Sequence, residues 1–191
     1  ITIPLAVGSL FYSDTIIMLL SGREYLQASA GMKLLFVSLI FASLGNLYSS
    51  GGILQAGKEK WMLVATIVGA CVNILANFYF IPLIGCTGAA LTTLVTEVIV
   101  FVILFICYQK YVGCSVGVKH SLKCFAGTVP FFIIYKIGIR IWPNSIAMQL
   151  LQILASGILY FVILFLLKDE IVIAIVRKII KIVRLGGKKH A

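Results

Sequence analysis

The sequence contains few charged or titratable residues, and this scarcity argues against an enzyme. Charged residues make up 12% of the 191 residues, with only six Asp or Glu side chains and two histidines. Both histidines, His120 and His190, lie near lysines, so no nucleophile, base and orienting residue can be grouped. A phosphate-binding glycine loop is also missing. We therefore expect no catalytic residue and no cofactor.

Cysteines are present but show no paired spacing. The five positions are Cys71, Cys86, Cys107, Cys114 and Cys124, an odd number without a CxxC pair. Disulfide frameworks and zinc sites require paired or clustered cysteines. We predict neither a disulfide nor a metal site, and expect these cysteines to be small buried residues.

Long polar stretches are absent as well, and apolar segments of membrane-crossing length take their place. Hydrophobic residues make up 61% of the chain, and the mean hydropathy is +1.11, whereas soluble domains contain roughly 45–50% apolar residues. A membrane helix needs about 20 apolar residues. The sequence predicts an all-α, polytopic membrane helix bundle with about six transmembrane helices. The predicted spans are Ile3–Leu20, Leu34–Leu54, Trp61–Ile81, Gly88–Tyr108, Leu122–Ile141 and Ile146–Leu167.

The net charge of +10 reflects membrane topology in this interpretation, not nucleic-acid binding. If the first span runs from inside to outside, most lysines and arginines fall on the cytoplasmic side, as the positive-inside rule requires. The exceptions on the outer side are Arg23, Lys33, Lys136 and Arg140. We therefore predict a multi-pass protein of the cytoplasmic membrane with a cytoplasmic C-terminus.

The last residues, 169–191, have a basic amphipathic pattern. Arg177, Lys181 and Arg184 share one arc of a helical wheel, and isoleucines and valines fill the rest. Such a helix is expected on the cytoplasmic membrane surface with its cations at lipid phosphates. The alternative is a cytoplasmic continuation of the sixth membrane helix.

Polar residues recur at helical spacing inside the third and fourth spans. Asn73 and Asn77 follow Ala65 and Gly69 at intervals of four, so the four residues share one face. Amides commonly join membrane helices, and small residues permit close approach. Two roles are therefore open for these asparagines: they pack between helices, or they line a substrate pathway.

Glu97 follows Ala89 and Thr93 at the same spacing, near the middle of the fourth span. A carboxylate at this depth is protonated, paired with a cation or exposed to a hydrated cavity. The candidate pathway or gating residues are therefore Glu97, Asn73, Asn77, Thr93 and Asp14.

The remaining polar positions fit simpler interpretations. Asp14 lies about two turns from the end of the first span, where solvation is favoured over a pathway role. Arg23 and Lys33 are expected as interfacial anchors. Gly51-Gly52 is expected to be a bend or a close-packing point.

An ordered set of residues resembles a known transporter family. The set comprises Gly22-Arg-Glu-Tyr25, Ala28, Asn46, Leu54-Gln-Ala-Gly-Lys58, Ala65-Thr-Ile-Val-Gly-Ala70, Asn73, Asn77, Ile81-Pro82, Gly85, Gly88-Ala-Ala90 and Thr93 to Glu97. Residues 1–108 resemble the C-terminal half of polysaccharide flippases of the multidrug, oligosaccharidyl-lipid and polysaccharide exporter superfamily.

The resemblance implies two lobes that rock around a central cavity and move lipid-linked oligosaccharide across the cytoplasmic membrane by alternating access. Residues 1–110 would be the last four helices of the C-terminal lobe, residues 111–168 two appended helices and residues 169–191 the basic tail. The chain begins at Ile1 within an apolar run, so we expect a piece of a longer protein whose N-terminal lobe precedes it. The implied partners are that lobe, lipid-linked saccharide and membrane lipids.

Three rival functions are open from the sequence. A cation-coupled drug antiporter of the same superfamily would use Glu97 or Asp14 as a proton or sodium site. A membrane-embedded glycosyltransferase or polymerase would need a large loop with acids or histidines, and these residues contain none. A structural subunit would leave Glu97 without a functional role.

Overall fold

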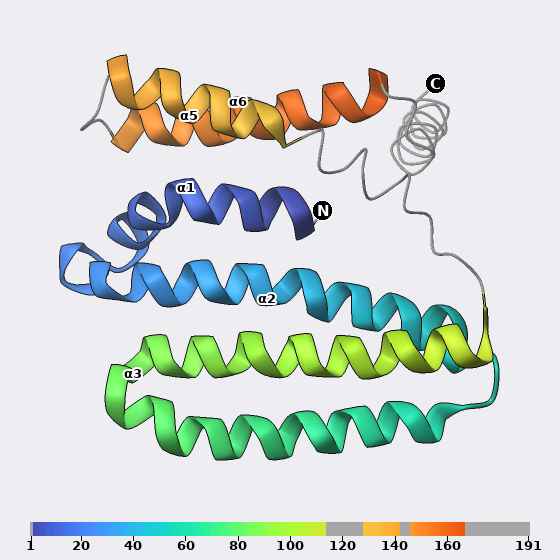
Figure 1. Ribbon diagram of the computed structural model, residues 1–191. Helices are drawn as coiled ribbons and strands as arrows, with labels where there is room; N and C mark the ends of the chain where they lie inside the picture. Colours follow the sequence, from blue (N-terminus) through green and yellow to red (C-terminus); the bar gives the residue numbers. More distant parts are fainter. Residues whose placement is uncertain (1, 114–127, 142–145, 167–191) are drawn as a thin grey trace, which may run out of the picture. The chain divides into compact units, whose positions relative to one another are not determined.

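The computed structural model describes residues 2–113, 128–141 and 146–166 (Figure 1). All regular secondary structure in these residues is helical, which confirms the predicted all-α class. The chain divides into two compact units, Ile1–Val116 and Gly117–Ala191. Each unit has its own helix packing.

The first unit is a series of helices that are consecutive in sequence. Its elements are α1 (Thr2–Leu20), a 3₁₀ segment η1 (Arg23–Ala28), α2 (Ser29–Tyr48), a π-helical turn η2 (Ser49–Ile53) and α3 (Glu59–Tyr111). Gly22 and Gly57 adopt positive φ angles of 94° and 66° at the turns before η1 and α3, a conformation that glycine adopts without steric cost. The second helix, α2, begins at Ser29, before the predicted start at Leu34.

Helix α3 is broken near its middle and contains the predicted third and fourth spans. Ile84 and Gly85 have non-helical backbone angles, and Gly85 has a φ of 59°. Pro82 lies just before the break and cannot donate a backbone hydrogen bond. The two halves, residues 59–83 and 86–111, run antiparallel and side by side (Figure 1). This break confirms the predicted gap between the third span, which ends at Ile81, and the fourth, which begins at Gly88.

Several helices are long and apolar enough to cross a membrane. Within the described residues these are Thr2–Leu20, Arg23–Ile53, Glu59–Tyr111 and Ala147–Leu166. The fold is therefore compatible with a multi-pass membrane protein.

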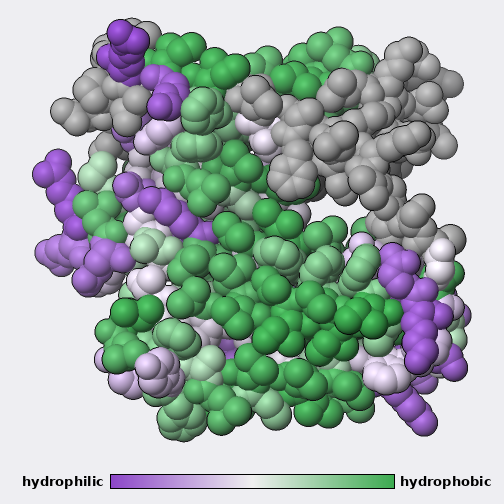
Figure 2. Space-filling view, in the orientation of Figure 1, coloured by the Kyte–Doolittle hydropathy of each residue, from purple (hydrophilic) through white to green (hydrophobic). Residues whose placement is uncertain are grey.

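In the first unit, small polar residues are buried and large apolar residues are exposed, which is the reverse of the pattern in soluble proteins. In α1, Ser9 and Ser13 are 2% and 0% exposed, while Leu5 and Leu10 are 48% and 47% exposed. Apolar residues cover the middle of α2 and α3, and hydrophilic residues gather toward the helix ends (Figure 2). Small and hydroxyl residues inside with leucines outside are typical of helices that pack in lipid.

An aromatic core joins α2 to the ends of α3. Its buried members are Tyr48, Ile53, Ala65, Leu104, Cys107 and Tyr108. A Cβ atom on Gly52 would lie only 2.3 Å from the Tyr108 ring, whereas one on Gly51 would have ordinary contacts. Gly52 is therefore a close-packing point, as predicted for the glycine pair.

The second unit contains an antiparallel pair of helices, α5 (Val129–Ile141) and α6 (Ile146–Leu166). Gln152, Tyr160 and Leu164 form part of a buried row on α6. The Gln152 side chain occupies the space that a Cβ atom on Gly138 of α5 would fill. Residues 122–127 of the predicted fifth span and the predicted tail, residues 169–191, lie outside the described residues.

Candidate functional site

The two asparagines of the third predicted span lie at the interface between the halves of α3. Asn77 Nδ2 donates to Asn73 Oδ1 over 2.9 Å, and Asn73 Nδ2 donates to Thr96 Oγ1 over 3.3 Å. The Thr92 hydroxyl lies 2.5 Å from Asn77 Oδ1 and 2.9 Å from the Ala89 carbonyl oxygen, so its single proton can serve either acceptor. These contacts support the packing interpretation of both amides.

Small residues permit this close approach of the two halves. Ala65 is 1% exposed, and a Cβ atom on Gly69 would lie 2.6 Å from Val100 Cγ2. Gly88 is tighter still, because its Cβ would lie 2.4 Å from the Phe80 carbonyl oxygen. The predicted face of small and amide residues therefore points at protein, as expected.

Sequence reasoning did not identify the threonine partners of these asparagines. Thr93, a predicted pathway residue, donates its hydroxyl proton to the Ala89 carbonyl of its own helix over 2.8 Å. The contacts across the hairpin come instead from Thr92 and Thr96. The parallel row of Gly88, Thr92 and Thr96 at intervals of four was the signal that could have revealed them.

Glu97 lines a polar pocket where α2 and both halves of α3 meet. The pocket has a volume of about 260 Å³, and Glu97 is half-buried at its edge. The other lining residues are Ala42, Gly45, Asn46, Ser49, Met62, Thr66, Val100 and Leu104. Asn46 and Ser49, which were not among the predicted site residues, therefore contribute to the surroundings of Glu97.

The pocket is rich in hydrogen-bond acceptors. Ser49 Oγ donates to the Asn46 carbonyl oxygen over 3.1 Å, and Thr66 Oγ1 donates to the Met62 carbonyl oxygen over 2.9 Å. Both hydroxyl protons are thus used within their own helices, and the oxygen lone pairs can still accept. Among the described residues, no cation lies within ion-pair distance of Glu97. The pocket oxygens can therefore accept hydrogen bonds from water or hydroxyl groups, or coordinate a cation.

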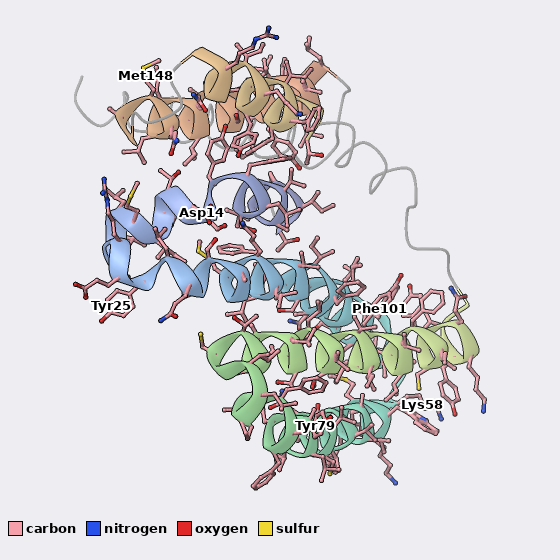
Figure 3. The ribbon with its side chains drawn as sticks, turned by 60° about the vertical axis from the view of Figure 1, so that its left-hand side comes forward. Asp14, Tyr25, Lys58, Tyr79, Phe101 and Met148 are labelled. Carbon is pink, nitrogen blue, oxygen red and sulfur yellow. The ribbon has the colours of Figure 1, made fainter. Side chains whose placement is uncertain are left out.

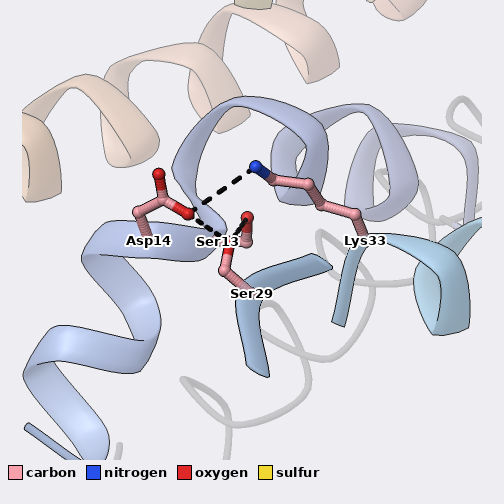
Figure 4. A network of polar contacts seen from close by, with 4 residues as sticks. All are labelled: Ser13, Asp14, Ser29 and Lys33. Atoms are coloured by element: carbon pink, nitrogen blue, oxygen red, sulfur yellow. Dashed lines mark hydrogen bonds and ion pairs between the residues drawn. The ribbon is translucent and has the colours of Figure 1, made fainter. Parts of the chain in front are cut away.

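Asp14 belongs to a separate polar cluster between α1 and α2 (Figure 4). Its carboxylate lies 3.6 Å from Lys33 Nζ and accepts a hydrogen bond from Ser29, whose Oγ is also 2.9 Å from Ser13 Oγ. The Asp14 side chain is 69% exposed, which agrees with the solvated interpretation. Lys33, expected only as an interfacial anchor, also pairs with this carboxylate.

An open apolar groove lies on the first half of α3, beside the hairpin interface. It has a volume of about 400 Å³ and is lined by Ile74, Asn77, Phe78, Ile81 and Pro82. Phe78 is 79% exposed, and Tyr79 projects from the same half of the hairpin (Figure 3). The Asn77 amide thus lies between the hairpin interface and an open apolar surface.

The cysteine prediction is wrong at two positions. Cys107 is buried, but Cys71 and Cys86 are exposed. Cys71 lies on a helix half that packs through the Ala65 and Gly69 face, and Cys86 directly follows the break in α3. Within the described residues, no group of three or more His, Cys, Asp or Glu side chains could hold a metal ion.

Comparisons of the chain with protein-family models, with curated proteins and with solved structures found no match. The fold by itself defines the class of protein: it is helical, and several of its described helices are long and apolar enough to cross a membrane.

Proposed function

We propose that the chain is part of a transporter that moves lipid-linked oligosaccharide across the cytoplasmic membrane by alternating access. The observation that carries this proposal is the Glu97 pocket, an acceptor-rich cavity between three helical segments of an otherwise apolar fold. A polar cavity among apolar helices is costly unless it is hydrated or occupied, so such cavities commonly serve a pathway.

Two surfaces of the same unit support the proposed substrate class. A lipid-linked saccharide has a polar head with many hydroxyl donors and a long apolar tail. The Glu97 pocket offers acceptors to hydroxyl groups, and the groove at Phe78 and Ile81 offers apolar surface to a hydrocarbon tail. The hairpin that carries Glu97 also forms that groove.

The transport mechanism needs a second wall. One row of helices provides one side of a central cavity, and alternating access requires two bodies that rock against each other. We propose that an N-terminal lobe supplies the other side. The 191 residues alone should insert into a membrane without flipping substrate, whereas a two-lobe parent should flip it.

The test compares Glu97→Gln with Glu59→Gln in the two-lobe parent. Glu59 is exposed at the start of α3 and outside the pocket, so it is a matched control for the loss of one carboxylate. We expect Glu97→Gln to lower translocation of a fluorescent lipid-linked oligosaccharide in proteoliposomes by about tenfold, the effect of losing 1.4 kcal/mol of stabilisation. Unchanged transport with Glu97→Gln would instead support a structural role.

A cation-coupled antiporter is the second candidate. The accepting oxygens of Glu97, Ser49 and Thr66 favour it, because a cation needs acceptors and Glu97 has no counter-charge among the described residues. Drug efflux that depends on sodium or proton gradients, without any effect on glycolipid, would favour the antiporter over the flippase.

A further inference from the structure

Two lysines from opposite ends of α3 meet at one tyrosine. Lys58 Nζ and Lys110 Nζ each lie 5.4 Å from the centre of the Tyr111 ring. Lys58 directly precedes the first half of α3, and Lys110 lies in the last turn of the second half. Closure of the hairpin therefore brings together two cations that are distant in the sequence.

The protein holds this cluster in place through backbone bonds and ring packing. The Lys58 N–H donates to the Ile53 carbonyl, and the Lys58 carbonyl accepts from the Trp61 N–H, each over 3.0 Å. Tyr111 packs on the aromatic core, and its ring centre lies 6.2 Å from that of Trp61. The ammonium groups are therefore presented from an ordered surface.

The charges of the cluster are not balanced within the described part of the chain. Two ammonium groups share one aromatic ring, and in the described residues no carboxylate lies within ion-pair distance of either. Both ammonium groups lie near the same ring, so an anion beside the ring would be attracted by both. Both lysines are exposed, so an external anion can reach them.

The position of the cluster indicates where that anion comes from. Trp61 and Tyr111 lie at the end of the apolar hairpin, where Leu63 is 62% exposed and charged residues begin. Tryptophan and tyrosine prefer the headgroup level of a bilayer. The anions concentrated at that level are the phosphodiesters of acidic lipids.

We propose that Lys58, Lys110 and Tyr111, with Trp61 beside them, bind the phosphodiester headgroup of an anionic glycerophospholipid. The lysines contact the phosphate oxygens, and Trp61 packs along the glycerol and upper acyl region. This site is independent of the Glu97 pocket and of the proposed transport activity.

The test uses Trp61 as a reporter of the adjacent lipid. The chain has two tryptophans, so Trp142→Phe leaves Trp61 as the only indole. This protein is reconstituted in phosphatidylcholine bilayers with increasing brominated phosphatidylglycerol or, separately, brominated phosphatidylcholine. Quenching by each lipid gives their relative association constant at Trp61. We expect a preference for phosphatidylglycerol of about fivefold per lysine.

Variants separate a specific site from general attraction to a charged surface. Lys58→Gln with Lys110→Gln should abolish the preference, whereas Lys60→Gln, an exposed lysine without a contact to Tyr111, should keep it. Tyr111→Phe should retain the preference, because the aromatic ring remains. Far-UV circular dichroism should report equal helicity for every variant.

Three outcomes would overturn the proposal. The first is equal quenching by both lipids in the Trp142→Phe protein. The second is the same loss of preference with Lys60→Gln as with the double variant, which would reduce the effect to net charge. The third is displacement by millimolar glycerol phosphate, which would assign the site to a soluble anion.

Discussion

At the residue scale, adjacent threonines have different roles because a helix rotates about 100° per residue. Thr92 is 1% exposed and reaches Asn77 across the hairpin, whereas Thr93 donates to its own helix. The chemistry of the two side chains is identical, so position alone decides which one joins the halves of α3.

This difference predicts unequal costs for two matched substitutions. Thr92→Val removes a bond between helices and should lower the free energy of unfolding by about 1 kcal/mol, the range measured for such bonds in membranes. Thr93→Val removes only a bond within the helix and should cost less than about 0.5 kcal/mol. Unfolding of both variants in mixed detergent micelles, with rising SDS, measures the two values. Equal costs would contradict the assignment of Thr92 as the interhelical partner.

At the element scale, the π-helical turn η2 brings the end of α2 onto the aromatic core. Gly52 and Gly51 are neighbours in this turn, but only Gly52 lies against the Tyr108 ring. The glycine therefore permits α2 and the second half of α3 to approach at their shared end. The Glu97 pocket is formed by α2 and both halves of α3, with Ser49 contributed by the turn.

The glycine pair predicts a second contrast in stability. Gly52→Ala would place its Cβ 2.3 Å from the Tyr108 ring, so we expect a loss of about 1–3 kcal/mol from overpacking. Gly51→Ala has room and should change stability by less than about 1 kcal/mol, with a gain expected from reduced chain entropy. The same SDS titration measures both, and an equal loss would refute the close-packing role of Gly52.

At the scale of the whole molecule, composition and burial indicate a membrane environment through separate arguments. Composition says only that the chain has more apolar surface than a soluble core can hide. The coordinates add where that surface lies, since leucines face outward while serines and glycines are buried. Glu24 in η1 and Glu59 at the start of α3 lie near helix ends, whereas Glu97 lies inside α3.

The membrane interpretation predicts that Glu24 and Glu59 lie on opposite sides of the bilayer, because α2 connects them. Glu24→Cys and Glu59→Cys in a cysteine-free background can be labelled with a membrane-impermeant maleimide. The positive-inside rule places Glu59 in the cytoplasm, so intact cells should label only Glu24→Cys. Labelling of both residues from outside would contradict a membrane-spanning α2. Labelling of Glu59→Cys alone would reverse the orientation.

Sequence reasoning reached the helices more reliably than the contacts between them. The breaks at Gly22, Gly57 and Gly85 were predictable because each glycine lies between two predicted apolar spans and glycine adopts turn conformations without steric cost. The start of α2 at Ser29 was missed, because the span was predicted from the apolar run that begins after Lys33. Local polarity is a weak guide where a helix continues beyond the hydrocarbon layer.

The candidate site was only partly predictable. Glu97 and the two asparagines were found because polar residues are rare in apolar helices. The association of Glu97 with Asn46, Ser49 and Thr66 was not, since these residues come from three segments and no spacing relates them.

The sequence by itself determined that this protein is helical, strongly apolar and broken at particular glycines, because these properties depend on composition and local backbone preference. Only the tertiary structure decided that Thr92, rather than Thr93, reaches Asn77, that Glu97 borders an acceptor-rich pocket, and that Lys58 and Lys110 share Tyr111. These three arrangements depend on how closely the helices approach and how they are rotated against one another. Packing of distant residues sets that geometry, and no single segment specifies it.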